Sequence, residues 1–342
     1  MATAELPIFK HVEPNKAWLA RLQEDIIEPD LPIVDPHHHL WELAGGYLLD
    51  DLLADLKSGH NVVSTVYAQC GYAYRKAGPE AFKPVGETEF VASVADEAAR
   101  RGEKVRVCEG IIGFADLLDQ QLDAVLDAHI EAAGGRFRAI RHIVARHEEF
   151  LASLLTPPPL HLLDDAAFRK GASRLQQRGL VFDAWLYHTQ IVELAAMARA
   201  LPDLQIVMNH FGGPLGIGPY QGRRDAAFTE WRVAIEELAS CPNVTVKLGG
   251  LSMAIIGFTF HRAPLPPSSG ELANAWRPYV ETAIESFGAD RCMFESNSPV
   301  DKGQCSYPVM WNAFKRIVSG ASESEKAALF HDTAARVYKL AR

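Results

Sequence analysis

The stretch LPIVDPHHHLW, residues 31–41, carries the pattern that decides the fold. It begins with a short apolar and β-branched run, which is typical of a buried β-strand. It then runs into three consecutive histidines, His37 to His39, where the strand is expected to end. Alternate side chains of a strand point to the same face, so His37 and His39 are expected to point together while His38 faces away. A solvated histidine-rich turn is the plain alternative for an isolated triplet of this kind.

Seven further strand-like runs follow, and each is separated from the next by a longer amphipathic stretch. The eight predicted strands cover residues 31–37, 61–70, 105–114, 137–145, 179–187, 204–210, 243–250 and 291–297. Mostly apolar strands that alternate with helices are typical of a parallel sheet with covered faces, and eight such units close a barrel. An open doubly wound sheet is the alternative, but the sequence contains no G-x-G-x-x-G after the first strand and no P-loop. We therefore predict an α/β protein with a single-domain (β/α)₈ TIM barrel at residues 31–342, after an N-terminal extension at residues 1–30.

Composition and charge exclude several classes of function. The 342 residues are 48% hydrophobic and 23% charged, which is a globular composition. The formal net charge of −9 is spread without a basic block, which argues against a nucleic-acid partner. The five cysteines form no C-x-x-C pair, so we expect free thiols in a reducing compartment. The segment MATAELPIFKHVEPNK lacks a signal-peptide pattern, and no apolar run reaches membrane-span length. We expect a cytoplasmic protein with a small-molecule partner, and the sequence leaves a homo-oligomer open.

Two more predicted strands run into a histidine. GLVFDAWLY is followed by His188, and LQIVMN is followed by His210. A single histidine after an apolar strand is more often a hydrogen-bonded packing residue than a ligand. Because the carboxyl ends of all barrel strands meet at one mouth, three such strand ends favour a shared functional site.

Two cations are predicted to face the same site. Arg141 and His142 are neighbours on the fourth strand and must point in opposite directions, and an inward guanidinium would suit a substrate carboxylate. An ion pair at the rim is the alternative for Arg141. Lys247 lies inside the mostly apolar seventh strand, where lysine is rarely chosen for packing. We therefore expect Lys247 to face the substrate.

This set of motifs resembles the amidohydrolase superfamily, and within it the branch of sugar-acid lactonases and pyrone-dicarboxylate lactonase. VDPHHHLW, residues 34–41, looks like the opening D-x-H-x-H-[FL]-W motif of that branch. WLYHTQIVELAAMARALPDLQIVMNHFGGPLG, from residue 185, resembles its fifth and sixth strands with their histidines. NVTVKLGGL, from residue 243, resembles its seventh strand, and RCMFESNSPVDK, from residue 291, its eighth. The resemblance covers residues 31–342 nearly end to end.

The resemblance implies hydrolysis of a lactone, or of a related carboxylic ester or amide, in a small carboxylated or polyhydroxy molecule. It carries catalytic positions over to His37, His39, His188 and His210. One divalent metal, Zn²⁺ or Mn²⁺, would be held by His37, His39 and His188. Some relatives of this branch work without metal, in which case the histidines would hydrogen-bond the substrate directly. Non-oxidative decarboxylation of an aromatic or unsaturated acid is an alternative activity, because related barrels with the same histidines perform it.

The eighth strand departs from the superfamily pattern. Relatives end this strand in an aspartate, within a G-S-D-W-P-like string, which binds metal and moves a proton, but here Asn297 stands at that position. An amide accepts no proton near neutral pH and is a poor metal ligand. We therefore expect the catalytic carboxylate to be Glu295 or Asp301, and we assign Asn297 to substrate binding with Arg141 and Lys247. A barrel that binds a ligand with little or no catalysis is the third alternative.

Overall fold

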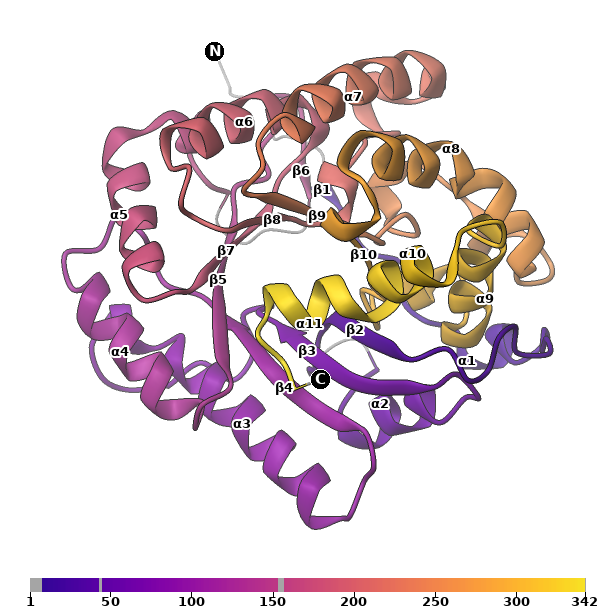
Figure 1. Cartoon of the computed structure of the whole chain (residues 1–342), viewed down its shortest axis with the longest axis horizontal. Coiled ribbons are helices and arrows are strands. Elements are labelled where there is room, and N and C mark those ends of the chain that lie inside the picture. Colours follow the sequence, from indigo (N-terminus) through magenta and orange to yellow (C-terminus); the bar gives the residue numbers. More distant parts are fainter. Residues whose placement is uncertain (1–7, 43–44, 153–156, 342) are drawn as a thin grey trace.

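The computed structural model describes residues 8–42, 45–152 and 157–341, and a barrel of parallel strands forms its centre (Figure 1). The barrel strands are β2 (Ile33–His38), β3 (Val62–Ala68), β4 (Arg106–Gly113), β5 (Phe137–Ile143), β7 (Val181–Trp185), β8 (Ile206–Met208), β9 (Val244–Leu248) and β10 (Cys292–Phe294). Each strand pairs in parallel with the next one along the chain. The first and last barrel strands, β2 and β10, approach each other just beyond their carboxyl ends, where the amide of His39 donates to the carbonyl of Ser298 at 2.7 Å. The predicted (β/α)₈ barrel is therefore confirmed, and it is nearly closed.

A helix follows each strand and covers the outside of the barrel (Figure 1). These helices are α2 (Leu49–Leu56), α3 (Val85–Arg100), α4 (Leu122–Ala132), α5 (Ala166–Gln177), α6 (Ile191–Ala200), α7 (Arg224–Ala239), α8 (Ser269–Phe287) and α9 (Tyr307–Ile317). Their buried residues recur three or four positions apart, as in α2 at Leu49, Leu52, Leu53 and Leu56. This spacing places one apolar stripe against the strands and leaves the opposite face to solvent.

The inside of the barrel is filled by apolar side chains that point inward from the strands. They are Val34, Val66, Ala68, Ile112, Ala139, Val181, Val207 and Met293. The C-terminal segment joins this cluster through Ala334, Ala335, Val337, Tyr338 and Leu340. Figure 1 shows α10 (Glu323–Ala327) and α11 (Thr333–Val337), in yellow, lying across one end of the barrel. Since Lys339 donates to the carbonyl of Gly179, just before β7, α11 closes the amino end of the strands.

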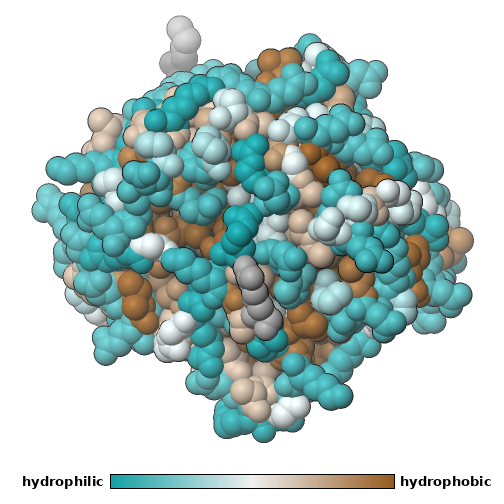
Figure 2. Space-filling model, in the orientation of Figure 1, coloured by the Kyte–Doolittle hydropathy of each residue, from teal (hydrophilic) through white to brown (hydrophobic). Residues whose placement is uncertain are grey.

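The surface at the end closed by α11 is mostly hydrophilic, with scattered hydrophobic side chains (Figure 2). Functional side chains of such barrels lie at the opposite end, on the loops that follow the strands. A small separate sheet lies among these loops, because β1 (Ile8–Phe9) pairs in parallel with β6 (Leu151–Ala152). Helix α1 (Lys16–Leu19) follows β1, while residues 1–7 of the predicted extension lie outside the described residues. Within the described ranges, no helix is both long and apolar enough to cross a membrane.

Candidate functional site

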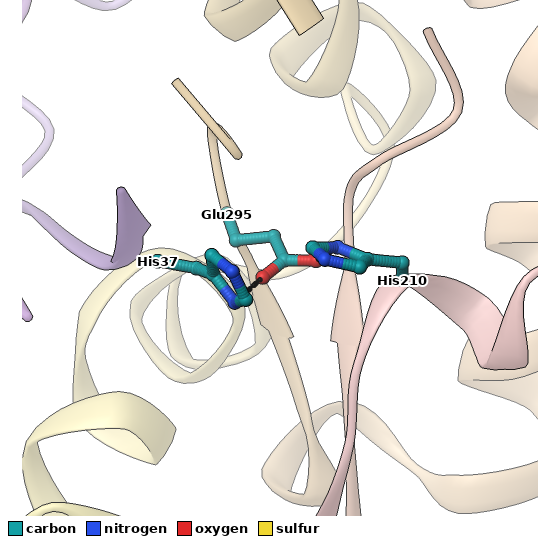
Figure 3. A group of neighbouring side chains, drawn as sticks. All are labelled: His37, His210 and Glu295. Carbon is teal, nitrogen blue, oxygen red and sulfur yellow. Dashed lines mark hydrogen bonds and ion pairs between the residues drawn. The ribbon is translucent and has the colours of Figure 1, made fainter. Parts of the chain in front are cut away.

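Three side chains from separate strand ends meet at the mouth of the barrel (Figure 3). His37 lies near the end of β2, His210 follows β8, and Glu295 follows β10. The carboxylate of Glu295 lies between the two imidazoles, with Oε1 2.6 Å from His210 Nδ1 and Oε2 3.0 Å from His37 Nδ1. Ligand atoms of the three residues lie within 4.8 Å of one another. We call these three residues the mouth cluster.

The histidine triplet alternates as expected of a strand. The ring centroid of His39 lies 4.9 Å from that of His37, and its Nδ1 is 2.8 Å from the carbonyl oxygen of Ala68. His38 faces away, and its Nε2 lies 3.0 Å from the hydroxyl of Thr65 on β3. The prediction that His37 and His39 share one face is therefore confirmed.

Burial governs the protonation of the mouth. It lowers the pKa of His37, His39 and His210 well below the usual range, because a charged imidazole would lose its hydration. Burial also raises the pKa of Glu295 to about 8. At neutral pH the imidazoles are therefore neutral, and the Glu295 carboxyl titrates in the range in which a general base is effective.

Several buried polar atoms of this region lack a hydrogen-bond partner among the described residues. They include His37 Nε2, His188 Nε2, His210 Nε2, Gln69 Oε1, Ser298 Oγ and Glu295 Oε2, the last of which has only the ion-pair contact with His37. Unpaired buried polar atoms are rare in folded proteins and call for an explanation such as a ligand, a water or an ion. Two neutral imidazoles and one carboxylate are also a donor set that Zn²⁺ takes in proteins. The residues present thus fit a divalent metal.

A buried ion pair supports the mouth cluster. Lys247 Nζ lies 2.9 Å from Asp183 Oδ1 and 3.2 Å from His37 Nδ1. Asp183 also accepts hydrogen bonds from the amide of Asn209 at 2.5 Å and from the hydroxyl of Tyr338 at 2.6 Å. Tyr338 follows α11, so the segment that closes the amino end of the barrel reaches the residues that hold the site. Such a fully bonded network fixes the position of each member.

Arg141 points into the barrel, and His142 points out. The Arg141 side chain donates from Nε to Asn209 Oδ1 at 3.1 Å and from Nη1 to the carbonyl of Gln69 at 2.6 Å. His142 packs outside the sheet, with its ring centroid 5.0 Å from that of Phe168 on α5. A guanidinium has five N–H groups, so these two bonds leave donors for a substrate.

His188 has contacts separate from those of the mouth cluster. Because β7 ends at Trp185, His188 begins a short 3₁₀ turn rather than ending the strand. Its Nδ1 accepts from the amide of Leu215 at 3.2 Å, and its Nε2 lies 3.7 Å from the carboxylate of Glu230. Among the residues that the structure describes, the group at the mouth whose ligand atoms lie close enough to share an ion is the mouth cluster. It contains His37 from the predicted metal set, but not His39 or His188.

The two candidate carboxylates after the eighth strand have different surroundings. Asp301 accepts from Asn297 Nδ2 at 2.9 Å through one oxygen and from the amide of Ser252 at 3.2 Å through the other. Burial raises the pKa of Asp301 to about 8. Asp301 thereby connects the segment of Asn297 with the loop of Ser252, and the Asn297 side chain is held by its hydrogen bond to Asp301. Since Glu295 directs both oxygens toward imidazoles instead, the geometry favours Glu295 as the carboxylate of the mouth.

Three residues that hold the site were absent from the sequence-based prediction. Asp183 is a charge inside the apolar run GLVFDAWLY, so the argument used for Lys247 could also have identified it. Asn209 directly precedes His210 and carries no distinctive signal. Tyr338 lies 155 positions from its partner Asp183, and nothing in its local sequence indicates the contact.

Comparisons with known proteins identify the family of this chain. The Amidohydrolase family model matches residues 34–340. The uncharacterized protein y4mH of Sinorhizobium fredii is 36% identical over 334 residues, which cover 91% of this chain and 99% of that protein. An L-fucono-1,5-lactonase of Burkholderia multivorans is 26% identical, with 90% of this chain and 96% of the relative covered. The crystal structure of an amidohydrolase from Burkholderia multivorans with bound zinc superposes with a TM-score of 0.71 at 25% identity, and the match covers 90% of this chain and 99% of the other. Because the family model spans the whole barrel, the chain belongs to the amidohydrolase family and is a hydrolase.

Proposed function

We propose that this protein hydrolyses the lactone of a small polyhydroxy or carboxylated acid. The observation that carries the proposal is the Glu295 carboxylate held between two neutral imidazoles at the barrel mouth, with Arg141 and Lys247 beside it. The similarity to an L-fucono-1,5-lactonase supports a lactone as the substrate. Glu295 also supplies the carboxylate that Asn297 cannot, which favours an active enzyme over a barrel that only binds.

In the proposed reaction, Glu295 takes a proton from water as the water oxygen attacks the lactone carbonyl carbon. Imidazole and guanidinium N–H groups of the mouth stabilise the negative charge that develops on the carbonyl oxygen. The proton then passes from Glu295 to the ring oxygen as the acyl C–O bond breaks. Water has been added across that bond, and the product is the open-chain hydroxy acid. Arg141 binds a carboxylate or hydroxyl group of the substrate, and Lys247 holds the His37 ring in place.

The mouth cluster is also our proposed metal site. His37, His210 and Glu295 would hold one divalent ion, with Zn²⁺ as first choice and Mn²⁺ as second. When bound, the ion would polarise the lactone carbonyl as a Lewis acid. The zinc found in the similar amidohydrolase of Burkholderia multivorans supports this choice.

Lactone opening is tested directly with purified protein and a panel of sugar δ-lactones. We expect acid release, followed with a pH indicator, with kcat/KM on the order of 10⁴ M⁻¹s⁻¹ or higher for the best substrate. Mass spectrometry should show a product heavier than the lactone by one water. Carbon dioxide release from aromatic acids, without opening of any lactone, would instead support the decarboxylase alternative.

The ligand set is tested by metal analysis of two histidine variants. We expect His210→Ala to lose most of the bound zinc, because His210 belongs to the mouth cluster, and His188→Ala to retain it. Zinc is measured per protein by atomic absorption after loading and gel filtration. The opposite result, with zinc lost from His188→Ala and kept by His210→Ala, would restore the ligand set predicted from the resemblance.

A cytoplasmic location is the remaining part of the proposal. All five cysteines are free thiols, and four of them are buried. Free thiols in this number suit a reducing compartment.

A further inference from the structure

Tyr338 enters the barrel from the end opposite the mouth cluster. It directly follows α11, and its side chain is fully buried. Just beyond it, Lys339 Nζ lies 2.8 Å from the carbonyl oxygen of Gly179, and the amide of Ala341 donates to Glu109 Oε1 at 2.8 Å. The chain is therefore anchored on one side of Tyr338 by α11 and on the other side by hydrogen bonds to the barrel.

The hydroxyl of Tyr338 donates to the carboxylate of Asp183, which is the branching point of a buried network. Tyr338 Oη lies 2.6 Å from Asp183 Oδ2. The other oxygen, Asp183 Oδ1, lies 2.9 Å from Lys247 Nζ and accepts from Asn209 Nδ2 at 2.5 Å. All four side chains are buried, so these partners replace the water that would otherwise surround the carboxylate. Each of its oxygens is thus held from a defined direction.

Two branches lead from this carboxylate to the functional side chains. In the first, Lys247 Nζ lies 3.2 Å from His37 Nδ1, which belongs to the mouth cluster. In the second, Asn209 Oδ1 accepts from Arg141 Nε at 3.1 Å. One branch therefore ends at the group that acts on the lactone carbonyl, and the other ends at the guanidinium that binds the rest of the substrate.

We propose that Tyr338 is a positioning residue: its hydroxyl orients the Asp183 carboxylate, and the carboxylate in turn holds both branches of the network. The inference rests on the proposed function, because it assigns a residue to the reaction at the mouth cluster. Tyr338 acts only through its partners and makes no contact with the substrate. The segment that closes the amino end of the barrel is thereby a part of the machinery at the carboxyl end.

Tyr338→Phe tests this role, because it removes the hydroxyl and keeps the ring, whose centroid lies 5.1 Å from Lys247 Nζ. We expect kcat/KM for the best lactone to fall by about 10- to 100-fold, the usual cost of losing a group that orients a functional side chain. Steady-state kinetics should show a lower kcat, because His37 is less well placed, together with a higher KM, because Arg141 is less well placed. A merely structural role would reduce the amount of folded enzyme, which lowers kcat in proportion and leaves KM unchanged.

Tyr47→Phe is the matched control, since Tyr47 takes part in the same kind of triad at another place. Its hydroxyl lies 2.6 Å from Asp55 Oδ2, which also lies 2.5 Å from Lys302 Nζ. The ammonium of Lys302 lies 4.9 Å from the centroid of the Tyr47 ring. Among the described residues, none of these three side chains hydrogen-bonds to the mouth cluster or to Arg141. We therefore expect kcat and KM of Tyr47→Phe to stay within about twofold of the parent values.

Unchanged kinetics in Tyr338→Phe, equal losses in both variants, or a loss of kcat that only follows the folded fraction by circular dichroism would each overturn the inference. Lactone opening by the parent protein would still support the proposed function in all three cases. If the parent opens no lactone, the proposed function fails by itself, and nuclear magnetic resonance of ¹⁵N-labelled histidines decides on Tyr338. We expect the imidazole signal of His37, identified by its absence in His37→Gln, to shift in Tyr338→Phe and to stay in place in Tyr47→Phe. A His37 signal that stays in place in both variants overturns the inference.

Discussion

Replacing Glu295 by glutamine is expected to lower kcat/KM for the best lactone by about 10²- to 10⁴-fold, the usual contribution of a general base. The carboxamide keeps the size of the side chain and can still pair with His210, so the barrel should remain folded. It cannot accept a proton from the attacking water. Steady-state kinetics of the two proteins measure the loss, and circular dichroism checks the fold.

Asp301→Asn is the comparison that locates the base. Both oxygens of Asp301 are bonded to Asn297 and to the Ser252 amide, so its loss should loosen these loops and lower kcat/KM by less than about tenfold. A large loss in Asp301→Asn together with near-normal activity in Glu295→Gln would move the base to Asp301.

The pH profile gives an independent check on the same residue. A general base acts in its ionised form, and burial raises the pKa of Glu295 to about 8. The kcat/KM of metal-free protein should therefore rise with pH and level off above about 8. A bound cation would favour the carboxylate and move this rise to lower pH. Asp301 has a pKa raised to a similar value, so the rise must disappear in Glu295→Gln and persist in Asp301→Asn to be assigned to Glu295.

The barrel and the inward-facing residues could be predicted because their signals are local. Two-residue periodicity separates His37 and His39 from His38, and it separates Arg141 from His142. The structure places all five side chains on the predicted faces. Eight apolar runs in alternation with amphipathic segments likewise leave few architectures other than the barrel.

What could not be predicted depends on where strands end and on contacts distant in sequence. The apolar run before His188 extends two residues past the end of β7 at Trp185, so periodicity gave no reason to separate this histidine from the others. Tyr338 reaches Asp183 only because α11 folds back under the barrel.

The buried ion pair between Lys247 and Asp183 leads to the largest expected effect on stability. Lys247→Met is expected to lower the free energy of unfolding by about 3–5 kcal/mol, because it leaves the fully buried Asp183 carboxylate without its cation. Chemical denaturation followed by circular dichroism measures this change. Lys57→Met is the matched control: Lys57 also pairs with a carboxylate, that of Glu103, but its side chain is 60% exposed. An exposed pair of this kind contributes about 0–1 kcal/mol, so the control should be nearly neutral.

The double variant Lys247→Met/Asp183→Asn separates the charge from the packing. The substituted carboxamide would keep an oxygen for the Tyr338 hydroxyl and would carry no charge, so much of the lost stability should return. Activity should stay low, because neither variant side chain holds the His37 ring as Lys247 does at 3.2 Å. Recovery of stability without recovery of activity would show that the cation is retained for the site and not for the fold. If the double variant is as unstable as Lys247→Met alone, the cost lies in the missing lysine side chain and the electrostatic explanation is wrong.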